Sequence, residues 1–270
     1  MKHNPVRTYV ITLTTIVLLA SVALASYAYI SYNAPSAIKK RPKIFEDITW
    51  PTHDTHANAP FDTDMDGIDI SCHQGRIMWE DMKQSSNRPK FIYTRVMRKG
   101  GGYDECYDNN ILGAHQAGIP VGSYVFYSHE VSATEHFNRF TYMVDPDEQD
   151  LIPMIDIEEA SISTGGTKHL RDSVLMLAHL LEQYYGKKPV IYSNQRFYEK
   201  HLKHLFDHYP LWIANYSRQP SLSTASHSIY LWQRSESGHV QGVWTSVDID
   251  CFVNGHTVDE LMLHDKKKDQ

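Results

Sequence analysis

The sequence predicts an α/β fold in the form of a closed barrel, and three observations support this prediction. Between residues 66 and 210, strand-like segments alternate with helix-like segments five times. After Pro210 the helical patterns fade, and three further strands follow with loops between them. Repeated strand–helix units are typical of parallel sheets and barrels, and a total of eight strands favours closure.

The predicted strands are short apolar runs rich in β-branched and aromatic residues. In the alternating part they lie at 67–71, 90–97, 119–127, 151–159 and 189–193. The three later strands lie at 211–214, 229–233 and 247–253.

The predicted helices lie at 79–85, 103–116, 132–144 and 170–184, and a fifth begins at Asn194. Ser132 followed by Glu135 three residues later is the capping-box pattern that begins a helix. Apolar residues recur at spacings of three and four from Leu170 to Leu181, and Gly186 ends that helix.

The N-terminal part of the chain predicts export. A basic head with Lys2 and Arg7 precedes an uncharged apolar run over residues 8–24. An Ala-Leu-Ala sequence at 23–25 is typical of a cleaved signal peptide, whereas continuation of the run to Ile30 would make an uncleaved membrane anchor. We therefore expect a signal peptide or anchor at 1–30, a linker at 31–65 and a barrel domain at 66–266.

Composition excludes several classes of protein. The 270 residues carry a net charge of −6, which argues against a nucleic-acid-binding protein. No metal-binding, Walker or dinucleotide motif is present, so we expect no cofactor and no metal. Three cysteines are too few for a disulfide framework. We expect an exported monomer, periplasmic or exterior if anchored and secreted if cleaved.

The segment 151–159 ends in acids and carries the main functional signal. Asp156 and Glu158 are two residues apart, so both side chains leave the same face of a strand with Cα atoms roughly 6.5–7 Å apart. Asp69 and Asp248 are likewise assigned to the C-terminal ends of predicted strands. Active residues of such barrels lie at the C-terminal ends of strands, so we expect these four acids to meet at one mouth.

Four carboxyl groups in one pocket predict acid–base chemistry. Burial and neighbouring negative charge both raise a carboxyl pKa, which leaves one acid protonated beside an ionised one. That pairing is what cleavage of a glycosidic bond requires. A D-x-E pair alone is more often a solvated loop, and it is the convergence that favours a catalytic site.

Seven segments, in order, resemble glycoside hydrolase family 25, the muramidase-type lysozymes. They are GIDISCHQG at 67–75 followed by Trp79, AGIPVGSYVF at 117–126, DIE at 156–158, PVIYS at 189–193, LWIANY at 211–216, WQ at 232–233 with Gly242, and VDIDCF at 247–252. The resemblance covers roughly residues 66–255. It implies a modified TIM-like barrel of five βα units followed by three further strands.

The resemblance also implies an activity, hydrolysis of the β-1,4 bond between N-acetylmuramic acid and N-acetylglucosamine in peptidoglycan. By matching position, Glu158 would be the general acid, and Asp156 would orient the substrate acetamido group or tune Glu158. Asp69 and Asp248 would line the cleft, with Asp69 as nucleophile or stabiliser. Enzyme nucleophile and substrate-assisted mechanisms both stay open, and retention of configuration is expected. Candidate sugar contacts are Tyr124, Tyr192, Trp212, Tyr216 and Gln233.

Two departures from the family pattern affect the expected site. Arg98 stands where the family usually has an acid, and Val125 stands where it usually has a histidine. Cys72 could form a disulfide with Cys251 or with Cys106, or the thiols could be free. Two other functions remain open: a non-catalytic barrel that binds peptidoglycan, and a chitinase-like hydrolase of N-acetyl sugars.

Overall fold

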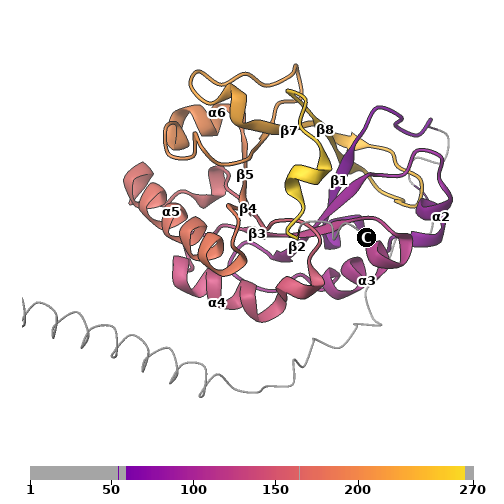
Figure 1. The fold of residues 1–270 in the computed structure, drawn as a ribbon, viewed down its shortest axis with the longest axis horizontal. Coiled ribbons are helices and arrows are strands. Elements are labelled where there is room, and N and C mark those ends of the chain that lie inside the picture. The colour runs from indigo at the N-terminus through magenta and orange to yellow at the C-terminus, as the bar shows by residue number, and fades with distance from the viewer. Residues whose placement is uncertain (1–53, 55–58, 164, 265–270) are drawn as a thin grey trace, which may run out of the picture. The chain divides into compact units, whose positions relative to one another are not determined.

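Eight strands follow one another around a closed barrel in the order of the chain (Figure 1). This is a computed structural model, and it describes residue 54 and residues 59–163 and 165–264. Within that range the strands are β1 (Gly67–Ile70), β2 (Phe91–Met97), β3 (Val121–Phe126), β4 (Met154–Asp156), β5 (Val190–Asn194), β6 (Leu211–Ala214), β7 (Ile229–Gly238) and β8 (Val247–Phe252). The predicted α/β barrel is confirmed.

The barrel closes by an antiparallel strand. Strands β1 to β7 pair in parallel, whereas β8 runs antiparallel to both β7 and β1. The start of β8 therefore lies at the end of the barrel where β1 finishes. The prediction that Asp248 lies at the C-terminal end of a strand is wrong, because Asp248 is the second residue of β8. Its placement at the mouth results from the reversed direction of β8.

The helices lie on the outside of the barrel (Figure 1). They are α2 (Trp79–Gln84), α3 (Tyr107–Ala117), α4 (Ala133–Met143), α5 (Gly166–Tyr185) and α6 (Gln195–Phe197). Helix α3 begins four residues later than predicted, since Asp104 Oδ1 accepts from the Cys106 amide and holds 103–105 in a turn. The capping box at α4 is half formed, because Glu135 pairs with Arg139 at 2.6 Å while Ser132 Oγ accepts from the Glu135 amide.

Aromatic side chains fill the barrel interior and support the mouth from below. Phe91, Tyr93 and Trp212 are buried, with ring centroids 5.3–6.1 Å apart and edge-to-face orientations. The Phe91 ring occupies the space that a Cβ at position 67 would need, which explains glycine there. The Tyr93 hydroxyl donates to the Ile152 carbonyl at 2.9 Å and joins β2 to the entry of β4.

The predicted signal peptide or anchor at 1–30 lies outside the described residues, as does most of the linker at 31–65. These assignments and the domain boundaries stay predictions. Among the described helices, none combines the length and apolar character that a membrane span requires.

Candidate active site

A cavity of about 200 Å³ opens at the barrel mouth, and all four predicted acids line it. Asp69 comes from β1, Asp156 from the end of β4, Glu158 from the loop after it and Asp248 from β8. The acids come from three separate segments of the chain, around Asp69, Asp156 and Asp248, so only the closed barrel brings all four together. The predicted convergence of these side chains is thus what the structure shows.

Asp69, which is buried, and Asp248, which is half-buried, form a hydrogen-bonded pair. They are register partners on β1 and β8, and their carboxyl groups share a hydrogen bond. Burial, followed by the charge of Asp69, raises the pKa of Asp248 to about 9. Burial also raises the pKa of Asp69 to about 6, although hydrogen bonds from Gln233 and Asp248 oppose the rise. At neutral pH Asp248 therefore carries the proton and Asp69 the charge.

Asp156 and Glu158 face the same cavity from the other side of the mouth. Burial raises the pKa of Asp156 well above its ordinary value, and the charge of Glu158 adds to this. Burial likewise raises the pKa of Glu158, with Glu159 and Asp248 as further causes. The Ser161 hydroxyl fixes the turn, since Oγ accepts from the Glu158 amide at 3.0 Å and donates to the Tyr127 carbonyl at 2.9 Å.

Arg95 is the one arginine or lysine among the described residues that line the cavity. Its Nε donates to Asp104 Oδ2 at 2.9 Å, and its Nη2 donates to Cys72 Sγ at 3.3 Å. Its positive charge lowers the pKa values of Asp69 and Asp156 against the larger effect of burial. One guanidinium cannot balance four carboxylates, so protons must supply the remaining neutralisation.

The Arg95 network also accounts for a group of possible metal ligands. Ligating atoms of Cys72, Asp104 and Glu105 lie within 4.8 Å of one another. The guanidinium already contacts two of these three side chains, and burial raises the pKa of the Cys72 thiol to about 11. A neutral thiol beside a fixed cation is a poor metal ligand. We therefore assign these residues to the support of Arg95.

Gln233 lines the cavity and orients Asp69. Its side chain is buried, and its Nε2 donates to Asp69 Oδ2 at 2.8 Å. The hydroxyls of Tyr192 and Tyr216 both donate to its Oε1 at 2.8 Å. Two donors on Oε1 fix the amide orientation, so the NH₂ group must face the carboxylate. This arrangement favours the ionised form of Asp69.

The other predicted sugar contacts differ in how exposed their side chains are. Tyr124 and Tyr192 line the cavity, and Tyr216 stands half exposed after β6. Trp212 is completely buried beneath the cavity, with its ring against Tyr93 and Tyr192. The prediction that Trp212 contacts sugar is wrong, because this ring belongs to the barrel core. Ser71, His73, Gln74, Phe126 and Met154 also line the cavity and were not predicted.

Trp212 instead supports a fifth carboxyl group. Its Nε1 donates at 3.0 Å to Oδ1 of Asp250, which is completely buried. Burial raises the pKa of Asp250 well above its ordinary value, and the charges of Asp69 and Asp248 add to this. The spacing of Asp248 and Asp250 on one face of a strand was the available sequence signal.

We expect Gln233→Leu to move the pH dependence of activity. Without the Gln233 donor, the pKa of Asp69 should rise above about 6. If ionised Asp69 is required, the acid limb of kcat/KM against pH should shift upward by roughly one unit, the usual effect of losing one hydrogen bond to a carboxylate. Tyr192→Phe, which leaves the Asp69 contact in place, should shift it less. An unchanged limb in Gln233→Leu would contradict the assignment.

We expect Asp248→Asn to stabilise the fold at alkaline pH. The folded-state pKa of Asp248, about 9, lies above the ordinary value of 3.8. The folded protein therefore binds more protons than the unfolded chain between these values, and stability falls as pH rises through that window. The neutral amide can still donate to Asp69. The gain measured by calorimetry should grow from almost none at pH 4 to several kcal/mol at pH 8, since each pH unit between the two pKa values is worth about 1.4 kcal/mol. A loss at pH 8 would contradict the protonated state.

The structure also places Arg98, which departs from the family pattern, and the three cysteines. Arg98 pairs with Glu105 at 3.2 Å and does not line the acid cavity. All three cysteines are free thiols. A Cys72–Cys251 disulfide is excluded, because the antiparallel register places Cys251 beside the start of β1, while Cys72 lies beyond its end, about 20 Å away at strand spacing.

Comparisons with known proteins agree with this geometry. Residues 68–243 match the model of Glycosyl hydrolases family 25. The uncharacterized protein YegX of Escherichia coli K12 is 33% identical over 72% of this chain and 71% of its own. An autolytic lysozyme of Clostridium acetobutylicum is 28% identical over 71% of this chain and 56% of its own. A family 25 glycosyl hydrolase structure from Bacillus anthracis, 22% identical, shares the fold over 79% of this chain and 98% of its own with a TM-score of 0.64.

Proposed function

Because the chain belongs to glycosyl hydrolases family 25, we propose that this glycoside hydrolase is a peptidoglycan muramidase. The proposed reaction is hydrolysis of the β-1,4 bond between N-acetylmuramic acid and N-acetylglucosamine. The observation that carries the proposal is the single cavity in which Asp69, Asp156, Glu158 and Asp248 stand together with raised pKa values. Such a cavity supplies a proton donor and a stabilising anion at the same bond.

In the proposed reaction Glu158 is the general acid. Its side chain is half-buried, whereas Asp69 and Asp156 are buried, and it stands on the loop after β4 rather than on a strand. A protonated carboxyl at the rim can reach the oxygen that joins two sugars, and it donates its proton as the bond from the anomeric carbon to that oxygen breaks. The raised pKa of Glu158 keeps that proton available closer to neutral pH.

We propose that the substrate acetamido group assists the reaction. Asp69 is already engaged by Gln233 and Asp248, which suits an electrostatic role toward the positive charge at the anomeric carbon. Asp156 Oδ1 is buried and has no hydrogen-bond partner among the described residues. A buried acceptor of this kind suits the N–H of an acetamido group, whose carbonyl oxygen would then attack the anomeric carbon with net retention.

Digestion of purified peptidoglycan followed by mass spectrometry tests the proposed function. A muramidase produces fragments with muramic acid at the new reducing end. Fragments ending in N-acetylglucosamine, or faster cleavage of chitin oligomers, would support the chitinase-like alternative. Binding of peptidoglycan without any new reducing ends in the unaltered protein would support the non-catalytic barrel.

We further propose that the chain acts outside the cytoplasmic membrane as a monomer. The apolar run and basic head of residues 1–30 support this placement, as either a cleaved signal peptide or an uncleaved anchor. Fractionation of cells that express the full chain, with the mass of the mature protein, separates secretion from anchoring.

A further inference from the structure

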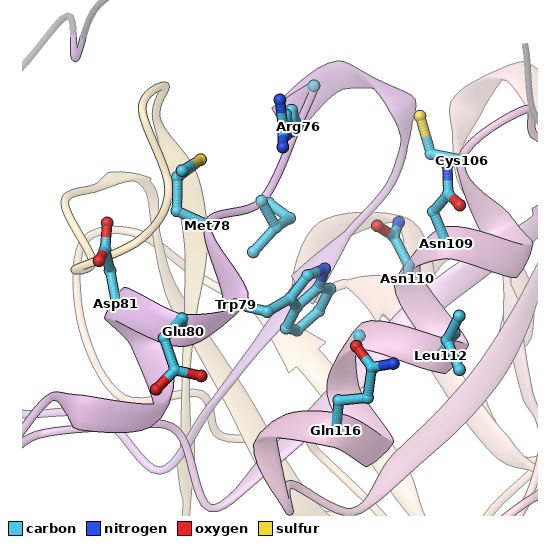
Figure 2. A pocket seen from close by; sticks show the side chains of 13 residues that line it. Arg76, Met78, Trp79, Glu80, Asp81, Cys106, Asn109, Asn110, Leu112 and Gln116 are labelled. Atoms are coloured by element: carbon cyan, nitrogen blue, oxygen red, sulfur yellow. The ribbon is translucent and has the colours of Figure 1, made fainter. Parts of the chain in front are cut away.

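A second cavity, larger than the acid cavity, is lined by residues that follow β1 and by residues of two helices (Figure 2). It is a groove of about 490 Å³ between the segment 75–78, helix α2 and helix α3. Glu80 and Asp81 from α2 lie on one side of it, and Asn109 from α3 lies on the other (Figure 2). We call this cavity the α2–α3 groove.

The α2–α3 groove is built into the fold. Trp79 forms its floor, and the indole lies so close to Gly113 of α3 that a Cβ at position 113 would collide with it. The Met78 amide donates to the Gly242 carbonyl at 2.8 Å, which ties the groove segment to the loop before β8. The groove therefore keeps its shape without a ligand.

One short loop separates the groove from the acid cavity. Ser71, His73 and Gln74 line the acid cavity, and the next two residues, Gly75 and Arg76, line the groove. The loop is held firmly, since the Ser71 amide donates to Gln74 Oε1 at 2.9 Å. Gln74 and Arg76 lie at most about 7.6 Å apart by Cα spacing, a span that two or three extended residues of a peptide cover.

The chemistry of the groove suits a peptide that carries both signs of charge. Arg76 and Asp81 are exposed, and neither forms an ion pair with another described residue. Asn109 and Gln116 offer amide groups, and the exposed side chain of Leu112 adds apolar contact. A site of this composition can bind a carboxylate, an ammonium group and peptide amides of one ligand at the same time.

We infer that the α2–α3 groove binds the peptide stem attached to the lactyl group of the substrate's muramoyl residue. This inference rests on the proposed function and adds a specificity site to it. The stem of peptidoglycan begins at the sugar in the cleft and carries carboxylates, amides and an amino group. Arg76 pairs with a stem carboxylate, and Asp81 pairs with the amino group. The enzyme thus selects peptide-bearing glycan over bare glycan.

The test compares intact peptidoglycan with the same material after an amidase has removed its stems. We expect kcat/KM of the unaltered enzyme to be several-fold higher on the intact substrate. Arg76→Gln should lower kcat/KM on intact substrate by about fivefold, the size expected of one exposed ion pair. Its kcat/KM on stripped substrate should stay within about twofold of that of the unaltered enzyme. Leu112→Trp, which fills the groove without a charge change, should act in the same direction. Lys83→Gln removes an α2 cation outside the groove and should leave kcat/KM on both substrates unchanged.

A binding measurement separates failure of the groove from failure of the proposed function. Co-sedimentation of Glu158→Gln with intact and stripped peptidoglycan should show tighter binding to the intact form, and Arg76→Gln added to it should abolish the difference. Equal binding to both forms, or equal kcat/KM on both, overturns the inference while cleavage itself still supports a muramidase. Absence of cleavage in the unaltered enzyme overturns the proposed function, and the binding comparison then still decides the groove.

Discussion

Glu158→Gln is expected to lower kcat on peptidoglycan by roughly a thousandfold, because it removes the proton donor and little else. General acids contribute about 10²–10⁴-fold to such reactions. The amide has the shape of the carboxyl group, and the Glu158 backbone is held by Ser161, so the fold and the glycan affinity should be retained. Release of new reducing ends gives the rate, and co-sedimentation with intact wall gives the binding.

Glu159→Gln is the matched control for this variant. Glu159 is the adjacent residue, is exposed, and accepts from Asn194 Nδ2 at 2.9 and 3.0 Å outside the acid cavity. Its charge contributes to the raised pKa of Glu158, so the basic limb of the pH profile should move slightly downward, while kcat at the optimum pH should change by less than about twofold. A substrate with a good leaving group, such as an aryl glycoside, needs no proton and should recover much of the Glu158→Gln loss. If Glu158→Gln keeps more than half of the activity, Glu158 is not the acid.

Asp69→Asn is the second change with a large expected effect. The anion beside the anomeric carbon would be lost, and kcat should fall by about 10²–10³-fold, the usual effect of removing one preorganised electrostatic group. The pKa of Asp69, about 6, also predicts that activity of the unaltered enzyme falls as pH drops through that value. The pH profile of the residual activity of Asp69→Asn should therefore lack the fall near pH 6.

The pH profile of kcat/KM separates this role from structural damage. A variant that is merely less stable would lose activity at all pH values and keep the limb near pH 6. An Asp69→Asn enzyme that retains the same limb would show that another group titrates there, and would remove Asp69 from the mechanism. Circular dichroism at each pH confirms that the compared enzymes are folded.

The sequence was enough to predict the barrel because its signals are local. Apolar runs, helix caps such as Ser132 and the glycine after α5 each mark their own element. The grouping of Asp69, Asp156 and Glu158 also follows from the barrel rule that the C-terminal ends of the strands carry the site. The direction of β8 could not be predicted in this way, since a short apolar run looks the same in parallel and antiparallel pairing.

The roles of Trp212 and Gln233 depended on packing that the sequence does not encode locally. An aromatic residue in a short strand looks equally suited to sugar stacking and to a core. Only the barrel closure shows that Trp212 lies under the cavity and donates to Asp250. Gln233 is likewise fixed by two tyrosines, 41 and 17 residues before it in the chain. The α2–α3 groove arises from two separate helices and had no sequence signature.

The central physical claim is that distant acids share one buried pocket and hold protons near neutral pH. NMR titration of the protein with ¹³C-labelled Asp and Glu carboxyl carbons measures this directly. The account predicts one carboxyl that titrates near pH 6 and another near pH 9, assigned to Asp69 and Asp248 by their loss in the Asn variants. Titration of every Asp and Glu carboxyl below pH 5 would contradict it.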